Sequence, residues 1–264
     1  IFTRNSTESI NVISNGLNLK GNILISDKEH NSNLLPWQMH KNKHNIFSTK
    51  DFDLQKFQDE WKKGTELLAT FGTSNADGQT LPIKEMIKIA HDNNAKVLID
   101  GAQHIPHHEV NVKKLGVDFL AFSGHKIFGP SGTGVLYAKK EHLEKLSPLL
   151  VGGDTVYDTT YNDKKWEELP HKFEAGLQNY AGILGLNAAI KYAERLGMNN
   201  ILKHITKLNK QLAEGLSDVK VLGSNSGITS FIPKMDVHEM AEMLNQQGVM
   251  VRSGAHCVHS WFNA

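Results

Sequence analysis

The sequence predicts an α/β fold with a mostly parallel sheet in a large domain, followed by a small α+β domain. Short apolar runs bounded by turn residues alternate with helical patterns through residues 1–196. Such alternation favours parallel strands joined by right-handed helical crossovers. After residue 197 the order changes to helix, two strands, helix and strand, which is typical of an α+β unit. We therefore expect two domains, 1–196 and 197–264.

The individual elements follow from apolar spacing and turn residues. In the large domain we expect strands at 22–26, 66–71, 96–100, 119–123 and 134–137, and helices at 53–61, 83–93, 141–150 and 181–196. Residues 41–50 are interpreted as a solvated basic connection and 151–170 as a long loop. In the small domain we expect helices at 201–216 and 237–247, with strands at 219–222, 228–232 and 249–251.

Composition excludes several classes of protein. The 264 residues carry a net charge of +1, so no strong field recruits nucleic acid or an anionic membrane. The chain has one cysteine, which excludes an internal disulfide and fits a reducing compartment. It shows no long apolar run and no signal-peptide pattern, so we expect a soluble cytoplasmic protein. Because it begins at Ile1 and stops inside an apparent loop, we expect a longer protein from which both ends are missing.

The stretch from Phe119 to Tyr137 carries the strongest chemical signal. An apolar strand ends in Ser123-Gly-His125-Lys126, and a glycine-rich turn follows. A lysine at the end of a buried strand has apolar residues behind it, which disfavours the ammonium form and leaves an amine suited to Schiff-base chemistry. The alternative is a surface lysine in a hairpin. A nucleotide phosphate loop is excluded because there the lysine follows the last glycine.

A second strand end carries Asp100-Gly-Ala-Gln103. Ligands of open α/β sheets lie at the carboxyl ends of the strands, so we expect Asp100 and Lys126 at the same edge. An acid that pairs with a protonated pyridine nitrogen and a lysine that forms an imine together suit pyridoxal phosphate.

Polar residues at the ends of other predicted strands and helices are further candidates for this site. Ser6 or Thr7 is expected to cap a helix, and a helix N-terminus with hydroxyl groups binds anions, although capping alone explains these residues equally well. His30 follows the strand at 22–26, where sites are often built. Asn75 follows the strand at 66–71 and either hydrogen-bonds a cofactor or forms an Asx-turn.

Cys257 lies near the C-terminal end of the chain in Arg252-Ser-Gly-Ala-His256-Cys257. A reactive cysteine needs a partly exposed, electropositive setting, which the nearby Arg252 and His256 can supply. One alternative is an inert loop cysteine. Another is a metal site with His256 and His259, but the spacing is tight and no fourth ligand is evident.

These motifs resemble a known family. Asp100-Gly-Ala-Gln103 followed by Ser123-Gly-His125-Lys126-Ile-Phe-Gly-Pro is similar to the class V aminotransferases, which are fold-type I pyridoxal-phosphate enzymes, and 251–257 resembles the loop of SUF-type (group II) cysteine desulfurases and selenocysteine lyases. The resemblance implies a seven-stranded-type sheet and a homodimer. It also implies conversion of L-cysteine to L-alanine, with the sulfur held as a persulfide on Cys257 for a sulfur-acceptor or iron–sulfur scaffold protein.

Two alternatives stay open. One alternative has the same fold and is a selenocysteine lyase or another class V aminotransferase. The other alternative is not an enzyme but a non-catalytic scaffold or sulfur-transfer partner.

The resemblance also implies site residues. Catalytic roles fall to Lys126, Cys257 and His30, and Arg252 would bind the substrate carboxylate. The cofactor would be held by Thr7, Ser6, His30, Asn75, Asp100, Gln103, Ser123, His125 and Lys126. No metal is implied. Leu177 stands where the family often has a threonine that reaches the phosphate of the other subunit.

Overall fold

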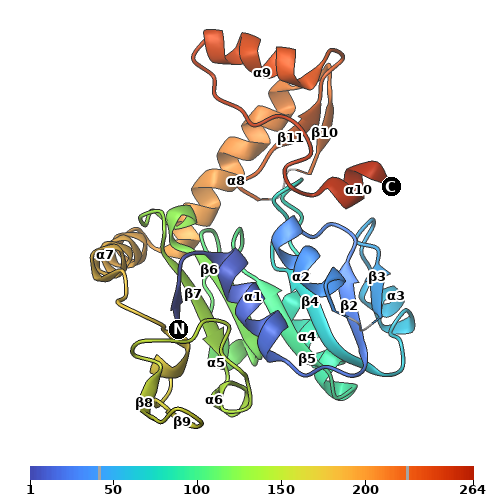
Figure 1. Cartoon of the computed structure of the whole chain (residues 1–264). Helices are drawn as coiled ribbons and strands as arrows, with labels where there is room; N and C mark the ends of the chain where they lie inside the picture. The colour runs from blue at the N-terminus through green and yellow to red at the C-terminus, as the bar shows by residue number, and fades with distance from the viewer. Residues whose placement is uncertain (41–42, 224–225) are drawn as a thin grey trace.

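The computed structural model describes residues 1–40, 43–223 and 226–264, and its centre is a seven-stranded sheet (Figure 1). In order across the sheet the strands are β1 (Phe2–Thr3), β7 (Gly134–Ala138), β6 (Phe119–Ser123), β5 (Lys96–Asp100), β4 (Thr65–Phe71), β2 (Asn22–Ser26) and β3 (His44–Phe47). The pairs from β6 to β3 are all parallel, whereas β7 runs antiparallel to both β6 and β1. The predicted mostly parallel sheet is confirmed.

The sheet is buried on both faces, as continuous apolar strands predict. On one face Ile10 and Ile13 of α1 (Ser6–Gly16) pack with Trp37 of α2 (Leu35–Gln38). On the other face Met86 of α4 (Ile83–Asp92) packs with Phe57 of α3 (Leu54–Asp59). The two helical layers hold the strand ends rigidly, and those ends carry the polar residues of interest.

Asp118, just before β6, links the ends of β5, β6 and β7 that lie opposite the carboxyl ends of the parallel strands. Its buried carboxylate accepts hydrogen bonds from Lys139 Nζ at 2.6 Å and from the Val97 backbone N–H at 2.8 Å, and it contacts both His91 and His142. These donors hold the pKa of Asp118 below its usual value despite burial. The short helix α5 (Val112–Leu115) precedes this corner, and α6 (Lys140–Leu143) follows β7.

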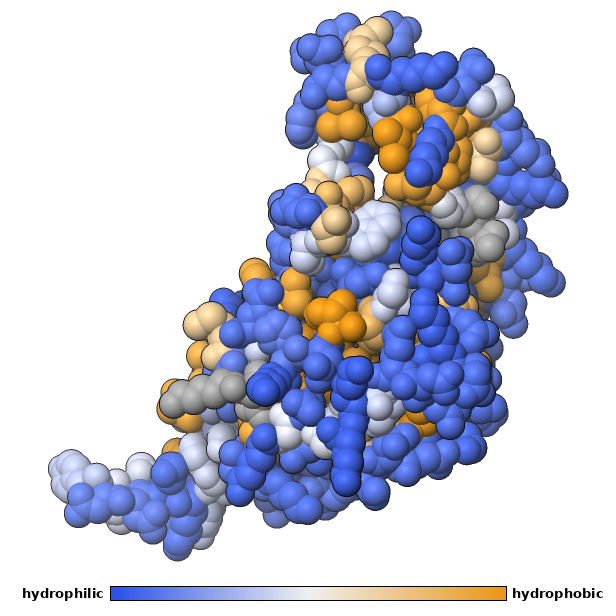
Figure 2. Space-filling view, turned by 90° about the vertical axis from the view of Figure 1, so that its right-hand side faces the viewer, coloured by the Kyte–Doolittle hydropathy of each residue, from blue (hydrophilic) through white to orange (hydrophobic). Residues whose placement is uncertain are grey.

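The C-terminal part leaves the sheet through two long helices. α7 (Tyr180–Leu196) and α8 (Met198–Gly215) meet at Gly197, whose φ of 83° suits glycine. The chain then forms β10 (Lys220–Leu222), β11 (Ser230–Ile232), α9 (Val237–Gln246) and α10 (His259–Asn263) (Figure 1). The first residue of α10, His259, contacts the Asn31 side chain of the sheet-bearing part at 3.1 Å. Apolar side chains gather on one face of this upper part (Figure 2). The domain boundary at residue 197 stays a prediction.

Several predicted elements are wrong. The 141–150 helix ends at Leu143, shortly before Pro148. The predicted loop at 151–170 contains a hairpin of β8 (Val156–Thr159) and β9 (Lys164–Trp166). Residues 249–251 form no strand. The 41–50 stretch contains β3, whose alternate side chains are exposed; residues 41–42 of that stretch lie outside the described part.

The start of α1 also differs from the prediction. Neither Ser6 nor Thr7 is the cap; Asn5 is, and its Oδ1 accepts a hydrogen bond from the Glu8 N–H at 2.9 Å. Gly134 makes this possible, because a Cβ there would lie 2.6 Å from Asn5 Cα. The displaced Ser6 is buried and faces the sheet.

The described residues also form three 3₁₀ turns: η1 (Asn31–Asn33), η2 (Gly124–Lys126) and η3 (His171–Phe173). Two of them contain or follow predicted site residues. None of the helices in the described ranges is long and apolar enough to cross a membrane.

Candidate active site

The carboxyl ends of β4, β5 and β6 and the first turn of α1 surround a cavity of about 270 Å³. All nine residues expected to hold a cofactor line it, and so does Arg252. The structure therefore brings together residues that are up to 246 positions apart in the sequence (6 to 252). Their roles stay predictions.

Asp100, the last residue of β5, lines this cavity. Its side chain is buried, and Oδ1 accepts a hydrogen bond from the Ala102 N–H at 2.9 Å. Burial raises the pKa of Asp100, whereas that hydrogen bond, Lys126 and His30 act in the opposite direction. A carboxylate in such a dry place attracts a cationic partner strongly.

Lys126 ends the η2 turn directly after β6 and lines the same cavity. Burial lowers the pKa of Lys126, and Arg252 lowers it further, while Asp100 and Cys257 raise it. The neutral amine is therefore more accessible than in a surface lysine, which is the condition for nucleophilic and base chemistry.

Hydroxyl groups and the start of α1 also line this cavity. Ser123 Oγ accepts a hydrogen bond from the Ser6 N–H at 2.9 Å and lies 3.0 Å from Ser6 Oγ. Thr7 Oγ1 lies 2.7 Å from Ser32 Oγ. His125 is exposed and lines the cavity too. A helix N-terminus surrounded by hydroxyls suits an anion such as a phosphate monoester.

His30 caps η1, and its tautomer follows from its contacts. Its Nδ1 accepts a hydrogen bond from the Ser32 backbone N–H at 3.1 Å, so the ring proton of the neutral form is on Nε2. Burial lowers the pKa of His30. The side chain is thus a neutral imidazole that offers an N–H to the cavity.

Glu29 lies directly behind His30 and was not predicted as a site residue. It is buried, accepts hydrogen bonds from Asn33 Nδ2 and from the Phe71 N–H, both at 2.8 Å, and also contacts the Ser26 hydroxyl. Burial raises the pKa of Glu29 to about 8. This group connects the ends of β2 and β4 behind the cavity.

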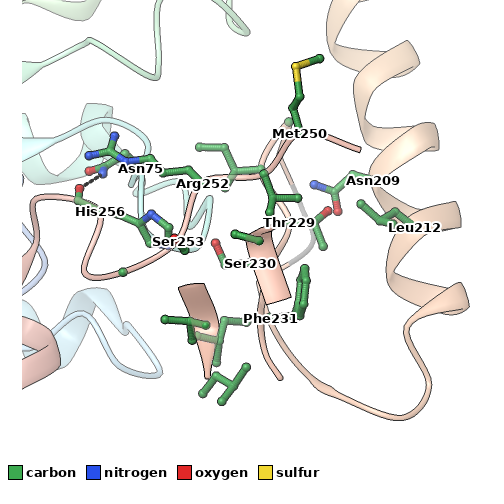
Figure 3. A pocket seen from close by; sticks show the side chains of 18 of the residues that line it. Asn75, Asn209, Leu212, Thr229, Ser230, Phe231, Met250, Arg252, Ser253 and His256 are labelled. Carbon is green, nitrogen blue, oxygen red and sulfur yellow. Dashed lines mark hydrogen bonds between the residues drawn. The ribbon is translucent and has the colours of Figure 1, made fainter. Parts of the chain in front are cut away.

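A larger cavity of about 660 Å³ adjoins the first one and reaches into the C-terminal part (Figure 3). His30, Asn75, Gln103, Lys126 and Arg252 line both cavities. The second cavity offers a path by which a small molecule reaches Lys126.

Cys257 is half-buried and lines neither cavity, although its neighbours Arg252 and His256 do. Arg252 Nη2 donates to Cys257 Sγ at 3.1 Å, so the expected electropositive neighbour is Arg252. His256 is a weaker candidate for this role, because burial lowers its pKa. In the described part of the chain, no group of three or more His, Cys, Asp or Glu side chains is arranged to hold a metal ion.

The sequence interpretation missed several residues of the site. Asn5, Ser32, Phe71, Thr73 and Ala102 also line the smaller cavity. Ser32 follows the predicted site residue His30 by two positions in a polar loop, which was the available signal. The others follow or precede strands and helices without a distinctive pattern.

Comparison with known proteins agrees with this geometry. The family model for aminotransferase class V matches residues 1–264. This chain belongs to the aminotransferase class-V family. A probable cysteine desulfurase of Halalkalibacterium halodurans is 39% identical over 97% of the chain and 68% of its own length. A cysteine desulfurase of Escherichia coli O8 is 35% identical with the same coverage.

Solved structures of this family share the fold. The apo structure of a cysteine desulfurase from Thermococcus onnurineus NA1 superposes with a TM-score of 0.94 at 37% identity, covering 100% of this chain and 70% of that one. The predicted fold class, fold-type I of the pyridoxal-phosphate enzymes, is confirmed.

Proposed function

We propose that this protein is a pyridoxal-phosphate-dependent cysteine desulfurase of the SUF type, which converts L-cysteine to L-alanine and keeps the sulfur as a persulfide on Cys257. The observation that supports the proposal is that Lys126 and Asp100 line one cavity with Arg252, while Cys257 contacts Arg252 and acts electrostatically on Lys126. Relatives with 35–39% identity bear the name cysteine desulfurase or probable cysteine desulfurase.

The smaller cavity fits the cofactor by the chemistry of the residues that line it. The buried Asp100 carboxylate suits a protonated pyridine nitrogen, and the hydroxyls at the start of α1 suit a phosphate. We assign Thr7, Ser6, Ser123 and His125 to the phosphate, and His30, Asn75 and Gln103 to the ring and its substituents. When bound, pyridoxal phosphate supplies a ring that withdraws electrons from the substrate's α-carbon.

Lys126 would hold the cofactor and then act as the base at the α-carbon of L-cysteine. Its lowered pKa keeps a usable fraction of neutral amine, and the positive charge it acquires is stabilised by Asp100. His30 carries its proton on Nε2 and would exchange it with the reacting groups. Arg252 would bind the substrate carboxylate. It is the only arginine among the described residues that line the two cavities.

Cys257 would attack the sulfur of L-cysteine as a thiolate. The sulfur–sulfur bond forms, and the bond between the substrate's Cβ and its sulfur breaks with its electron pair going to carbon. A proton added at Cβ and the return of a proton from Lys126 to the α-carbon complete L-alanine, and Cys257 is left as a persulfide. Arg252 Nη2, 3.1 Å from Sγ, is the polar group in contact with the reacting sulfur.

The persulfide needs a second thiol to accept the sulfur, so we propose a sulfur-acceptor or iron–sulfur scaffold protein as partner. We also propose a homodimer, because Tyr180 and Leu184 of α7 are 61% and 68% exposed, and Leu177, just before this helix, is exposed as well. Leu177 has no hydroxyl for a phosphate in the other subunit, so Gln178 or a backbone N–H would replace the family's threonine there.

The test combines two variants with separate expected defects. Lys126→Ala should abolish alanine formation from L-cysteine and the visible absorbance of the lysine-bound cofactor. Cys257→Ala should keep that absorbance but lose persulfide formation. Full alanine formation by Cys257→Ala would favour another reaction of the family, and wild-type protein without bound cofactor would favour a non-catalytic role.

A further inference from the structure

The backbone around Cys257 has an uncommon conformation. His256 and Cys257 have φ values of 50° and 60°, so two consecutive residues with a Cβ are left-handed. Side chains other than glycine rarely adopt this region. Such a pair persists only where surrounding contacts hold it.

Two hydrogen bonds from the sheet-bearing part of the chain hold these two residues. Asn75 Nδ2, in the loop after β4, donates to the His256 carbonyl at 2.7 Å (Figure 3). The Asn31 backbone N–H, at the start of η1, donates to the Cys257 carbonyl at 2.7 Å. The following residue, Val258, is fully buried, so the segment is fixed on both sides of the sulfur.

We propose that Asn31, through its backbone N–H, and Asn75, through its amide, are positioning residues for the Cys257 sulfur. By fixing the two carbonyls they keep the left-handed turn that places Sγ 3.1 Å from Arg252 and within electrostatic reach of Lys126. This inference rests on the proposed function of Cys257. It also gives Asn75 a task beyond the cofactor contact predicted for it.

Asn31 allows a sharp test because its two contacts are separable. Its backbone N–H contacts Cys257, whereas its side-chain Nδ2 contacts His259 Nδ1 at 3.1 Å. Asn31 is the first residue of η1, where proline is well tolerated, and His30 before it has φ −57° and ψ 144°, which suits a residue preceding proline. Asn31→Pro therefore removes the N–H donor, and Asn31→Ala is the matched control that keeps it.

The experiment uses the cofactor-loaded protein and L-cysteine. In a single turnover, Asn31→Pro should form persulfide on Cys257 about tenfold more slowly than wild type, while Asn31→Ala stays within about twofold. Amide exchange of a peptide covering 254–258 should accelerate only in Asn31→Pro. Equal rates in both variants would overturn the positioning role. Wild type without any persulfide would instead contradict the proposed function itself.

A second pair keeps the test valid if Asn31→Pro does not fold. His256→Gly and His256→Ala both lose the imidazole, but only glycine adopts a φ of 50° without steric cost. The glycine variant should form persulfide about fivefold faster than the alanine variant. Equal rates in this pair would show that the left-handed turn does not govern sulfur transfer.

Discussion

At the scale of single residues, the site depends on buried carboxyl groups whose protonation is set by their surroundings. Glu29 is the clearest case, because burial raises its pKa to about 8 while the carboxyl of an unfolded chain titrates near 4.5. Between these values the folded state binds more protons than the unfolded state. Stability must therefore fall as pH rises through that window.

Glu29→Gln tests this linkage. The wild-type free energy of unfolding should fall with pH between 5 and 7.5 by up to about 1.4 kcal/mol per pH unit relative to the variant. Chemical denaturation of both proteins across this range measures the difference. Parallel pH profiles would show that Glu29 is ionised throughout in the folded protein.

At the scale of elements, the first turn of α1 joins stability to the proposed anion-binding part of the site. Asn5 caps this helix and also lines the smaller cavity. Asn5→Ala should lower the free energy of unfolding by about 1 kcal/mol and weaken cofactor binding, whereas Asn5→Ser should retain most of both. Denaturation and cofactor titration measure these effects. If Asn5→Ala lowered stability but left cofactor binding unchanged, the proposal that this turn binds the phosphate would be contradicted.

Long apolar strands and amphipathic helices were predictable, because their buried positions require apolar residues at a regular spacing in the sequence. β2, β4, β5 and β6 lie where expected to within one residue. β3 and the hairpin of β8 and β9 were not predictable in this way, since their side chains are largely exposed and backbone pairing defines them. Local composition alone does not reveal such pairing.

The site shows the same division. Asp100 ends an apolar strand and Lys126 follows another by three residues, so the sequence predicted that both lie at the carboxyl ends of neighbouring strands. Asn31 acts on Cys257 through its backbone N–H, which every residue except proline has. No side-chain pattern can reveal that kind of contact, and only the folded arrangement of residues 31 and 257 does.

At the scale of the whole molecule, the exposed apolar side chains of α7 predict self-association. Tyr180 and Leu184 lie one turn apart on this helix, and the exposed Leu177 precedes it. Light scattering should give twice the monomer mass for the wild type, and Leu184→Glu should shift it toward the monomer. Met243→Glu on α9, also at an exposed apolar position, is the control and should leave the dimer intact. A monomeric wild type would contradict the proposed homodimer.

The central claim is that the thiol of Cys257 accepts the sulfur of L-cysteine. Because Cys257 is the only cysteine of the 264 residues, a sulfur adduct on a cysteine has one possible position. Mass spectrometry of the cofactor-loaded protein after incubation with L-cysteine should find one added sulfur atom on Cys257, together with L-alanine in solution. L-alanine formed while Cys257 remains an unmodified thiol would contradict the account.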